Sequence, residues 1–291
     1  MSFLSNLING ISLGSIYAII ALGYTMVYGI AKMLNFAHGD IIMVGAYVCF
    51  YAMYLAKLPS VVAVLIAVVV CLGLGVLVEK LAYKPLRKAN SLAVLITAIG
   101  VSYFLENLAQ IVFGANTVSF RSIVSDEPIT IGKQVVAPIT LLSIACCVVV
   151  MIALTIFVNQ TKVGKAMRAC SEDKGAAQLM GISVNRTISL TFAIGSALAA
   201  LAGALLCSAY PALMPTTGSM PGIKAFTAAV FGGIGSIPGA FIGGLLLGII
   251  EILSKAYIST QVSDAIVFLV LVVILLVRPS GILGKPMREK V

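Results

Sequence analysis

Residues 160–186, QTKVGKAMRACSEDKGAAQLMGISVNR, form the longest strongly polar stretch in an otherwise apolar sequence. The stretch carries five lysines and arginines against two acids, Glu172 and Asp173. Long apolar runs flank it on both sides, at residues 135–158 and 187–209. Because lysine and arginine are kept on the cytoplasmic side of membrane proteins, this stretch predicts a cytoplasmic loop between two membrane spans.

The middle of this loop predicts a short amphipathic helix outside the bilayer. Its two acids and the serine before them are favourable at a helix start, and Gly181 is favourable at a helix end. Composition alone is equally compatible with a solvated loop that only fixes topology. The pattern Glu172-Asp173-x-x-Ala176-Ala177-x-x-x-Gly181, followed directly by a span, resembles the coupling segment of permease subunits in ATP-binding-cassette importers.

The composition is that of a membrane protein. Of the 291 residues, 60% are hydrophobic and 10% are charged. Apolar runs near the roughly 20 residues that cross a bilayer recur along the whole chain. A soluble protein of this size would need a far more polar surface. We therefore predict an all-α polytopic membrane protein, a single domain over residues 1–291 with about eight transmembrane helices.

The net charge of +9 comes from short basic clusters between the apolar runs. Such clusters set topology and attract anionic lipid headgroups, so the lipid bilayer is the expected partner and nucleic acid is not. The six cysteines show no paired spacing and His38 is the single histidine, so no metal site is predicted. The sequence has no nucleotide-binding or catalytic pattern, so the chain is expected to be no enzyme.

A polar segment at residues 31–40 follows the first predicted span, 7–30, and leaves little room for an external loop. It predicts either a short cytoplasmic turn or a helix interrupted within the membrane, which is tolerated beside protein or a water-filled cavity. For His38 a structural role at a helix end is favoured, and Asp40 is suited to cap the next helix.

Residues 222–240 contain a second interruption, where Gly233, Gly235 and Gly239 lie beside a proline in an apolar run. Glycine- and proline-broken segments are typical of discontinuous or re-entrant helices in transporters, although two short helices with a glycine hinge would look similar. Glu106 lies well inside the predicted span 92–113. An acid there costs on the order of 2.5–3.5 kcal/mol on insertion, so we expect it to face the bundle interior or a cavity.

Three motifs, in this order, resemble the LIV-type branched-chain amino acid permease family, and specifically its smaller high-affinity subunit. They are NFAHGD at 35–40, the coupling pattern at 172–181, and FTAAVFGGIGSIPGA at 226–240. The resemblance implies a permease that carries leucine, isoleucine or valine across the bacterial inner membrane and binds no cofactor itself. It also implies four kinds of partner: a second related permease, two cytoplasmic ATPase subunits that use ATP, a periplasmic amino-acid-binding protein, and the bilayer.

On this interpretation each motif receives a role. The residues expected to couple to the ATPases are Glu172, Asp173, Ala176, Ala177 and Gly181. The residues expected along the translocation pathway are Asn35, His38, Asp40, Glu106, Gly233, Gly235 and Gly239. Two alternatives stay open: a secondary transporter driven by an ion gradient, which the acids Glu106 and Glu251 would suit, and an importer permease for urea, amides or another small polar solute.

Overall fold

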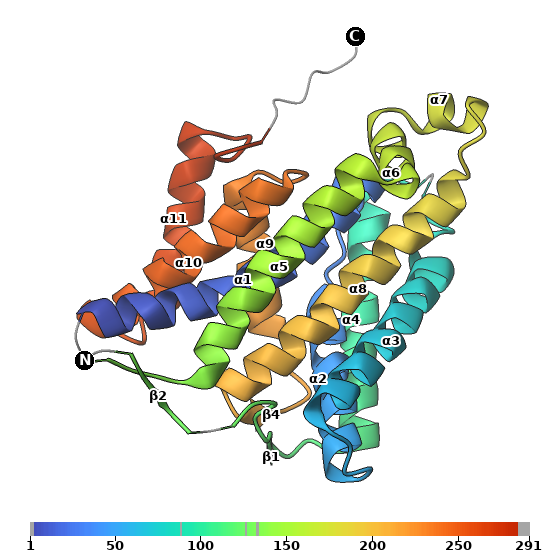
Figure 1. The fold of residues 1–291 in the computed structure, drawn as a ribbon. Coiled ribbons are helices and arrows are strands. Elements are labelled where there is room, and N and C mark those ends of the chain that lie inside the picture. The colour runs from blue at the N-terminus through green and yellow to red at the C-terminus, as the bar shows by residue number, and fades with distance from the viewer. Residues whose placement is uncertain (1–2, 88, 126, 132–133, 285–291) are drawn as a thin grey trace.

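A computed structural model describes residues 3–87, 89–125, 127–131 and 134–284. The chain folds into a bundle of tilted helices, with short strands at one end only (Figure 1). Six helices in the described part are long and apolar enough to cross a membrane. They are α1 (Phe3–Ala31), α3 (Ser60–Val78) with its π-helical extension η1 (Glu79–Tyr83), α4 (Ser91–Phe113), α5 (Pro138–Gln160), α8 (Val184–Ala209) and α10 (Ile237–Tyr257).

Three further apolar helices are shorter: α2 (His38–Tyr54), α9 (Ser219–Gly232) and α11 (Ser263–Val277). The predicted all-α polytopic class is therefore confirmed, and its helix count is close to the expected one. Strands β1 (Val118–Ser119) and β4 (Ala212–Leu213) pair antiparallel, and β2 (Ile129–Ile131) forms a hairpin with β3 (Gln134–Val136).

Helix α1 is the centre of the bundle. Its most apolar window is 94% buried, and it packs against α5, α8, α9 and α10. Glycines allow the close approach to α10: a Cβ on Gly14 would lie 2.8 Å from the Cα of Leu245. Small residues are the usual means by which helices pack in lipid, where apolar side chains gain little by clustering. By contrast, the most apolar windows of α3 with η1, α4 and α5 are only 28%, 22% and 17% buried.

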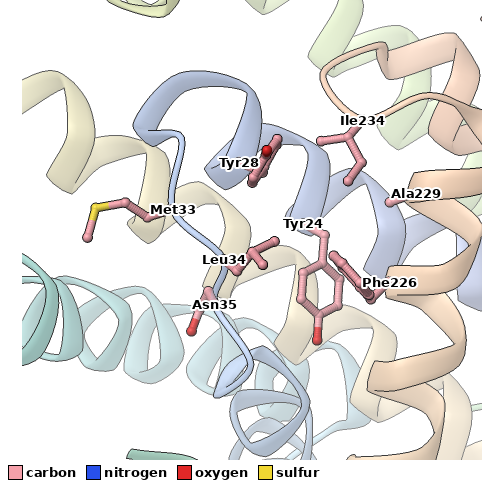
Figure 2. A pocket seen from close by; sticks show the side chains of 8 residues that line it. All are labelled: Tyr24, Tyr28, Met33, Leu34, Asn35, Phe226, Ala229 and Ile234. Atoms are coloured by element: carbon pink, nitrogen blue, oxygen red, sulfur yellow. The ribbon is translucent and has the colours of Figure 1, made fainter. Parts of the chain in front are cut away.

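Both predicted interruptions are present. Residues 32–37 leave the helical conformation after α1 and run back along it to the start of α2 (Figure 2). Residues 233–236 separate α9 from α10, and Gly233 and Gly235 have φ of 105° and 94°. The first turns of α2 and α9 meet inside the bundle, where a Cβ on Gly39 would lie 2.7 Å from the carbonyl oxygen of Gly218.

The polar loop 160–186 holds two helices, α6 (Lys162–Glu172) and α7 (Lys174–Leu179), instead of the single helix predicted. Asp173 separates them because its side chain accepts hydrogen bonds from the backbone N–H groups of Gly175 and Ala176, at 2.8 and 3.0 Å. Gly181, with φ of 80°, follows α7 as predicted. Helices α6 and α7 lie at the end of the bundle opposite β1, β2 and β4 (Figure 1).

Candidate functional site

A narrow slot lies where the two interruptions approach each other (Figure 2). Residues 33–35 of the first interruption form one wall, and Phe226, Ala229 and Ile234 form the other. Tyr24 and Tyr28 of α1 lie between them. The slot has no interior space for a water molecule, so it is closed in this structure.

Asn35 and His38 are buried on either side of the turn that starts α2. The Asn35 side-chain oxygen accepts a hydrogen bond from the Tyr83 hydroxyl at 2.8 Å, which attaches the interruption to the end of η1. The His38 ring packs on Tyr24, with ring centroids 4.5 Å apart. A Cβ on Gly23 would lie 2.6 Å from Nε2 of His38, so α1 carries glycine at the point where the imidazole is seated.

The acids Asp40 and Glu106 lie near each other at the level where α2 and α9 begin. The prediction that Asp40 caps α2 is wrong, because the N-cap is Ala37 and no side chain caps this helix. Asp40 is instead buried inside the first turn of α2, where the helix N-terminus favours a carboxylate. Glu106 of α4 is half-buried and accepts a hydrogen bond from the Ser219 hydroxyl at the start of α9. The expectation that Glu106 faces the bundle is therefore met. In the part of the chain that the structure describes, neither acid has a lysine or arginine ion-pair partner.

The three glycines of the second interruption lie away from these acids, at the other end of α9. There the C-terminal segment covers the interruption, since the backbone N–H groups of Ile282 and Leu283 donate to the carbonyls of Phe231 and Gly232, both at 3.0 Å. The predicted pathway residues thus form two groups, at the two ends of α9. The slot lies between them, because Asn35 and Ile234 both line it.

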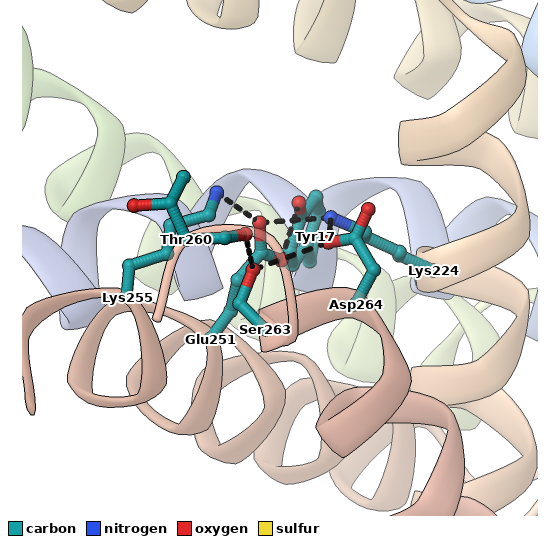
Figure 3. A network of polar contacts seen from close by, with 7 residues as sticks. All are labelled: Tyr17, Lys224, Glu251, Lys255, Thr260, Ser263 and Asp264. Atoms are coloured by element: carbon teal, nitrogen blue, oxygen red, sulfur yellow. Dashed lines mark hydrogen bonds and ion pairs between the residues drawn. The ribbon is translucent and has the colours of Figure 1, made fainter. Parts of the chain in front are cut away.

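A buried charged network joins α1, α9, α10 and α11 (Figure 3). Glu251, only 1% exposed, accepts hydrogen bonds from the Tyr17 hydroxyl at 2.8 Å and from the ammonium groups of Lys224 and Lys255 at 2.8 and 2.6 Å. Lys224 also pairs with Asp264 at 2.7 Å. The network contains two lysines and two acids, so its formal net charge is zero. Glu251 was named from the sequence, whereas Lys224 was not, although a lone lysine in an apolar run is itself a signal that a buried acid lies nearby.

The coupling segment is tied directly to the first interruption. The Lys174 ammonium of α7 donates to the carbonyl oxygen of Ala31, the last residue of α1, at 2.9 Å. Partial burial, together with the neighbouring charges of Arg87 and Lys32, lowers the pKa of Lys174. Ala177 is buried, whereas Glu172, Asp173 and Ala176 are exposed. The hydrogen bond from Lys174 therefore joins α7 to the residue just before the interruption.

Leu179 and Met180 are the most conspicuous surface feature of the coupling segment. They are 91% and 82% exposed, although they lie outside the apolar helices that would contact lipid. Adjacent large apolar side chains that are this exposed are a feature of surfaces that bind another protein or the membrane.

A bundle of apolar helices with two broken helices at its centre and an exposed helical loop at one end has the architecture of a membrane transport permease. The chain belongs to the branched-chain amino acid transport system / permease component family, whose model matches residues 6–275.

Relatives of known name match nearly the whole chain. The chain is 45% identical to the high-affinity branched-chain amino acid transport system permease protein LivH of Salmonella typhimurium, over 99% of this chain and 98% of that protein. It is 42% identical to the corresponding permease protein BraD of Pseudomonas aeruginosa, with the same coverage. Among solved structures, PsaBC from Streptococcus pneumoniae in complex with Fab matches with a TM-score of 0.47 and 15% identity, over 97% and 91% of the two chains. The family predicted from the three motifs is confirmed.

Proposed function

We propose that this chain is the permease subunit of an ATP-binding-cassette importer that brings leucine, isoleucine and valine across the bacterial inner membrane. The observation that carries the proposal is 45% identity, over nearly the full length of both chains, to a permease protein named for high-affinity branched-chain amino acid transport. The chain forms the membrane passage and performs no chemistry, and ATP is bound and hydrolysed by separate subunits.

The working assembly contains a second related permease, two cytoplasmic ATPase subunits and a periplasmic amino-acid-binding protein. The exposed pair Leu179 and Met180 supports an ATPase docking surface at α7, and the hydrogen bond from Lys174 to Ala31 supports a route from that surface to the slot. A ligand or partner shifts a conformational equilibrium only when it binds one state better. ATPase closure must therefore favour the permease state in which residues 32–37 move away from α9.

Replacing both Leu179 and Met180 by aspartate is expected to reduce ATPase association at least about 10-fold, because buried apolar anchors carry most of an interface's free energy. Co-purification of the ATPase subunits from native membranes, followed by ATP hydrolysis and leucine uptake in proteoliposomes, measures the effect. Ile129→Asp, an exposed apolar residue of the hairpin at the opposite end, is the matched control. It should retain the ATPases.

The same preparation separates the alternatives. A wild-type chain that accumulates leucine under an ion gradient, with no ATPase present, would be a secondary transporter and the proposal would be wrong. A complete complex that hydrolyses ATP but imports urea or an amide instead of leucine would correct the substrate and leave the transporter class standing.

A further inference from the structure

A cavity of about 410 Å³ opens between α1, α5 and α10, at the end of the bundle opposite the coupling segment. This volume falls within the roughly 300–1,000 Å³ range of small-molecule sites. Unlike the slot, the cavity is open in this structure. None of its lining residues was singled out from the sequence.

The polar lining of the cavity comes from four segments. Asn6, Asn9 and Ser12 follow one another at helical spacing along one face of α1, and Thr140 faces them from the first turn of α5. Lys255, in the last turn of α10, is the single charged residue of the lining. Tyr210 follows the end of α8 and completes the polar set.

The apolar lining consists of aliphatic side chains: Leu13, Ile16, Ile139 and Ile252. The cavity therefore offers one cation, several amide and hydroxyl groups, and an aliphatic wall. A small aliphatic α-amino acid has the matching groups. Its carboxylate would take the cation, its ammonium would take amide and hydroxyl oxygens, and its side chain would take the wall.

Lys255 can bind a ligand in addition to Glu251, because Glu251 also accepts hydrogen bonds from two other groups. The Lys255 side chain is 34% exposed and uses one of its three donors on Glu251. Glu251 keeps the Lys224 ammonium and the Tyr17 hydroxyl when Lys255 turns toward a ligand (Figure 3). The cavity also reaches Ile16, next to Tyr17, so its inner end adjoins the network that holds α9.

We propose that this cavity is the outer binding site for the amino acid on its way through the permease, with Lys255 holding the substrate carboxylate. The proposal rests on the proposed function and adds the site at which substrate is first held. The amino acid released by the binding protein occupies the cavity, where its carboxylate contacts Lys255. It remains there until the closed slot opens.

Thiol labelling from outside tests the site. In the assembled transporter in membrane vesicles, Thr140→Cys should react with a membrane-impermeant thiol reagent, and saturating L-leucine should slow the reaction at least about 10-fold. Thr117→Cys, on the exposed loop at the same end of the bundle, is the matched control and should react equally with and without leucine. The wild-type chain gives the background from its six native cysteines.

A second set of variants tests the role of the cation. In the Thr140→Cys background, Lys255→Gln should raise the leucine concentration needed for protection about 10-fold or more, since a charged donor is lost. Lys255→Arg should largely restore it, and Lys57→Gln, an exposed lysine of the loop between α2 and α3, should leave it unchanged. Leucine uptake is measured in the same vesicles, so a failure of the proposed function is seen independently.

Two results would overturn the inference. One is wild-type leucine uptake with no leucine protection of Thr140→Cys, which would place the pathway elsewhere while leaving the proposed function intact. The other is protection that follows the content of anionic phospholipid in the vesicles and ignores leucine, which would make the cavity a lipid headgroup site.

Discussion

Glu251→Ala is expected to destabilise the fold by about 3–5 kcal/mol, because breaking a buried ion pair leaves an uncompensated charge in a low-dielectric interior. Glu251 is the acceptor for Tyr17, Lys224 and Lys255, and it connects α10 to α1 and α9. After its removal, Lys224 keeps only Asp264, whose side chain is 43% exposed. Thermal unfolding of the purified chain in detergent, followed by size-exclusion chromatography, measures the loss.

Two companion variants show whether the lost charge is the cause. Glu127→Ala removes an exposed acid from the loop before β2 and should leave the melting temperature unchanged. Lys224→Met combined with Glu251→Met removes both members of the buried pair and should recover much of the stability, because apolar replacement of a whole pair is often neutral. Unfolding of Glu251→Ala at the wild-type temperature would contradict the assigned role of the network.

Gly39→Val is expected to abolish leucine uptake and to cost about 1–3 kcal/mol or more, the usual range for overpacking a tightly packed interior. A Cβ at Gly39 would lie 2.7 Å from the carbonyl oxygen of Gly218, a distance that real Cβ atoms do not adopt. The atom that it meets is backbone, so no side chain can turn aside. The first turns of α2 and α9 would have to separate.

Gly73→Val is the matched control, because Gly73 also lies in an apolar helix but a Cβ there meets no atom within 4 Å. Both changes introduce the same β-branched side chain, so the difference between them isolates the contact between α2 and α9. Uptake per folded molecule and the melting temperature are measured for both. Equal behaviour of the two variants would mean that this contact matters neither for folding nor for transport.

The two interruptions could be predicted from the sequence because few structures accommodate such residues in apolar runs. Polar Asn35 and Asp40 are unfavourable on a lipid-facing helix. The Gly-Gly-x-Gly sequence at 232–235, followed by Pro238, disfavours the continuation of one. The structure agrees in detail at Gly233, whose φ of 105° is reserved almost entirely for glycine.

The coupling segment shows the limit of local reasoning. Ser171 and Asp173 are both good N-cap residues, and the sequence does not tell which one caps α7. In the structure α6 continues through Glu172, because Met167 and Cys170 are buried beneath it against Met26 and Ile30 of α1. The boundary is therefore set by the local cap at Asp173 together with the packing of α6 on a distant helix, and the second of these cannot be read from the local sequence.

The charged network and the outer cavity could not be predicted from the sequence, because each is formed by residues that are distant in sequence. Tyr17 and Glu251 are 234 residues apart in sequence, and the cavity is lined from α1, α5, α10 and the segment after α8. Spacing along the chain does not predict contacts between residues that are so far apart in sequence. Pairing of a buried lysine with some acid could be expected, but the choice of Glu251 depends on how α9 packs against α10.

The central position of α1 has a consequence for the making of the protein. This helix precedes α8 and α10 in the chain, so it is synthesised before the two helices that contact it most. The mean hydropathy of α1 is 1.6, well below the value of 3.3 for α3 with η1. Helix α1 also carries the buried polar residues Asn6, Ser12 and Thr25. Until α8 and α10 are made, α1 must therefore stay in the bilayer, or beside the insertion machinery, without the helices that later bury it. A chain truncated before α10 lacks the helix that makes the most extensive contact with α1.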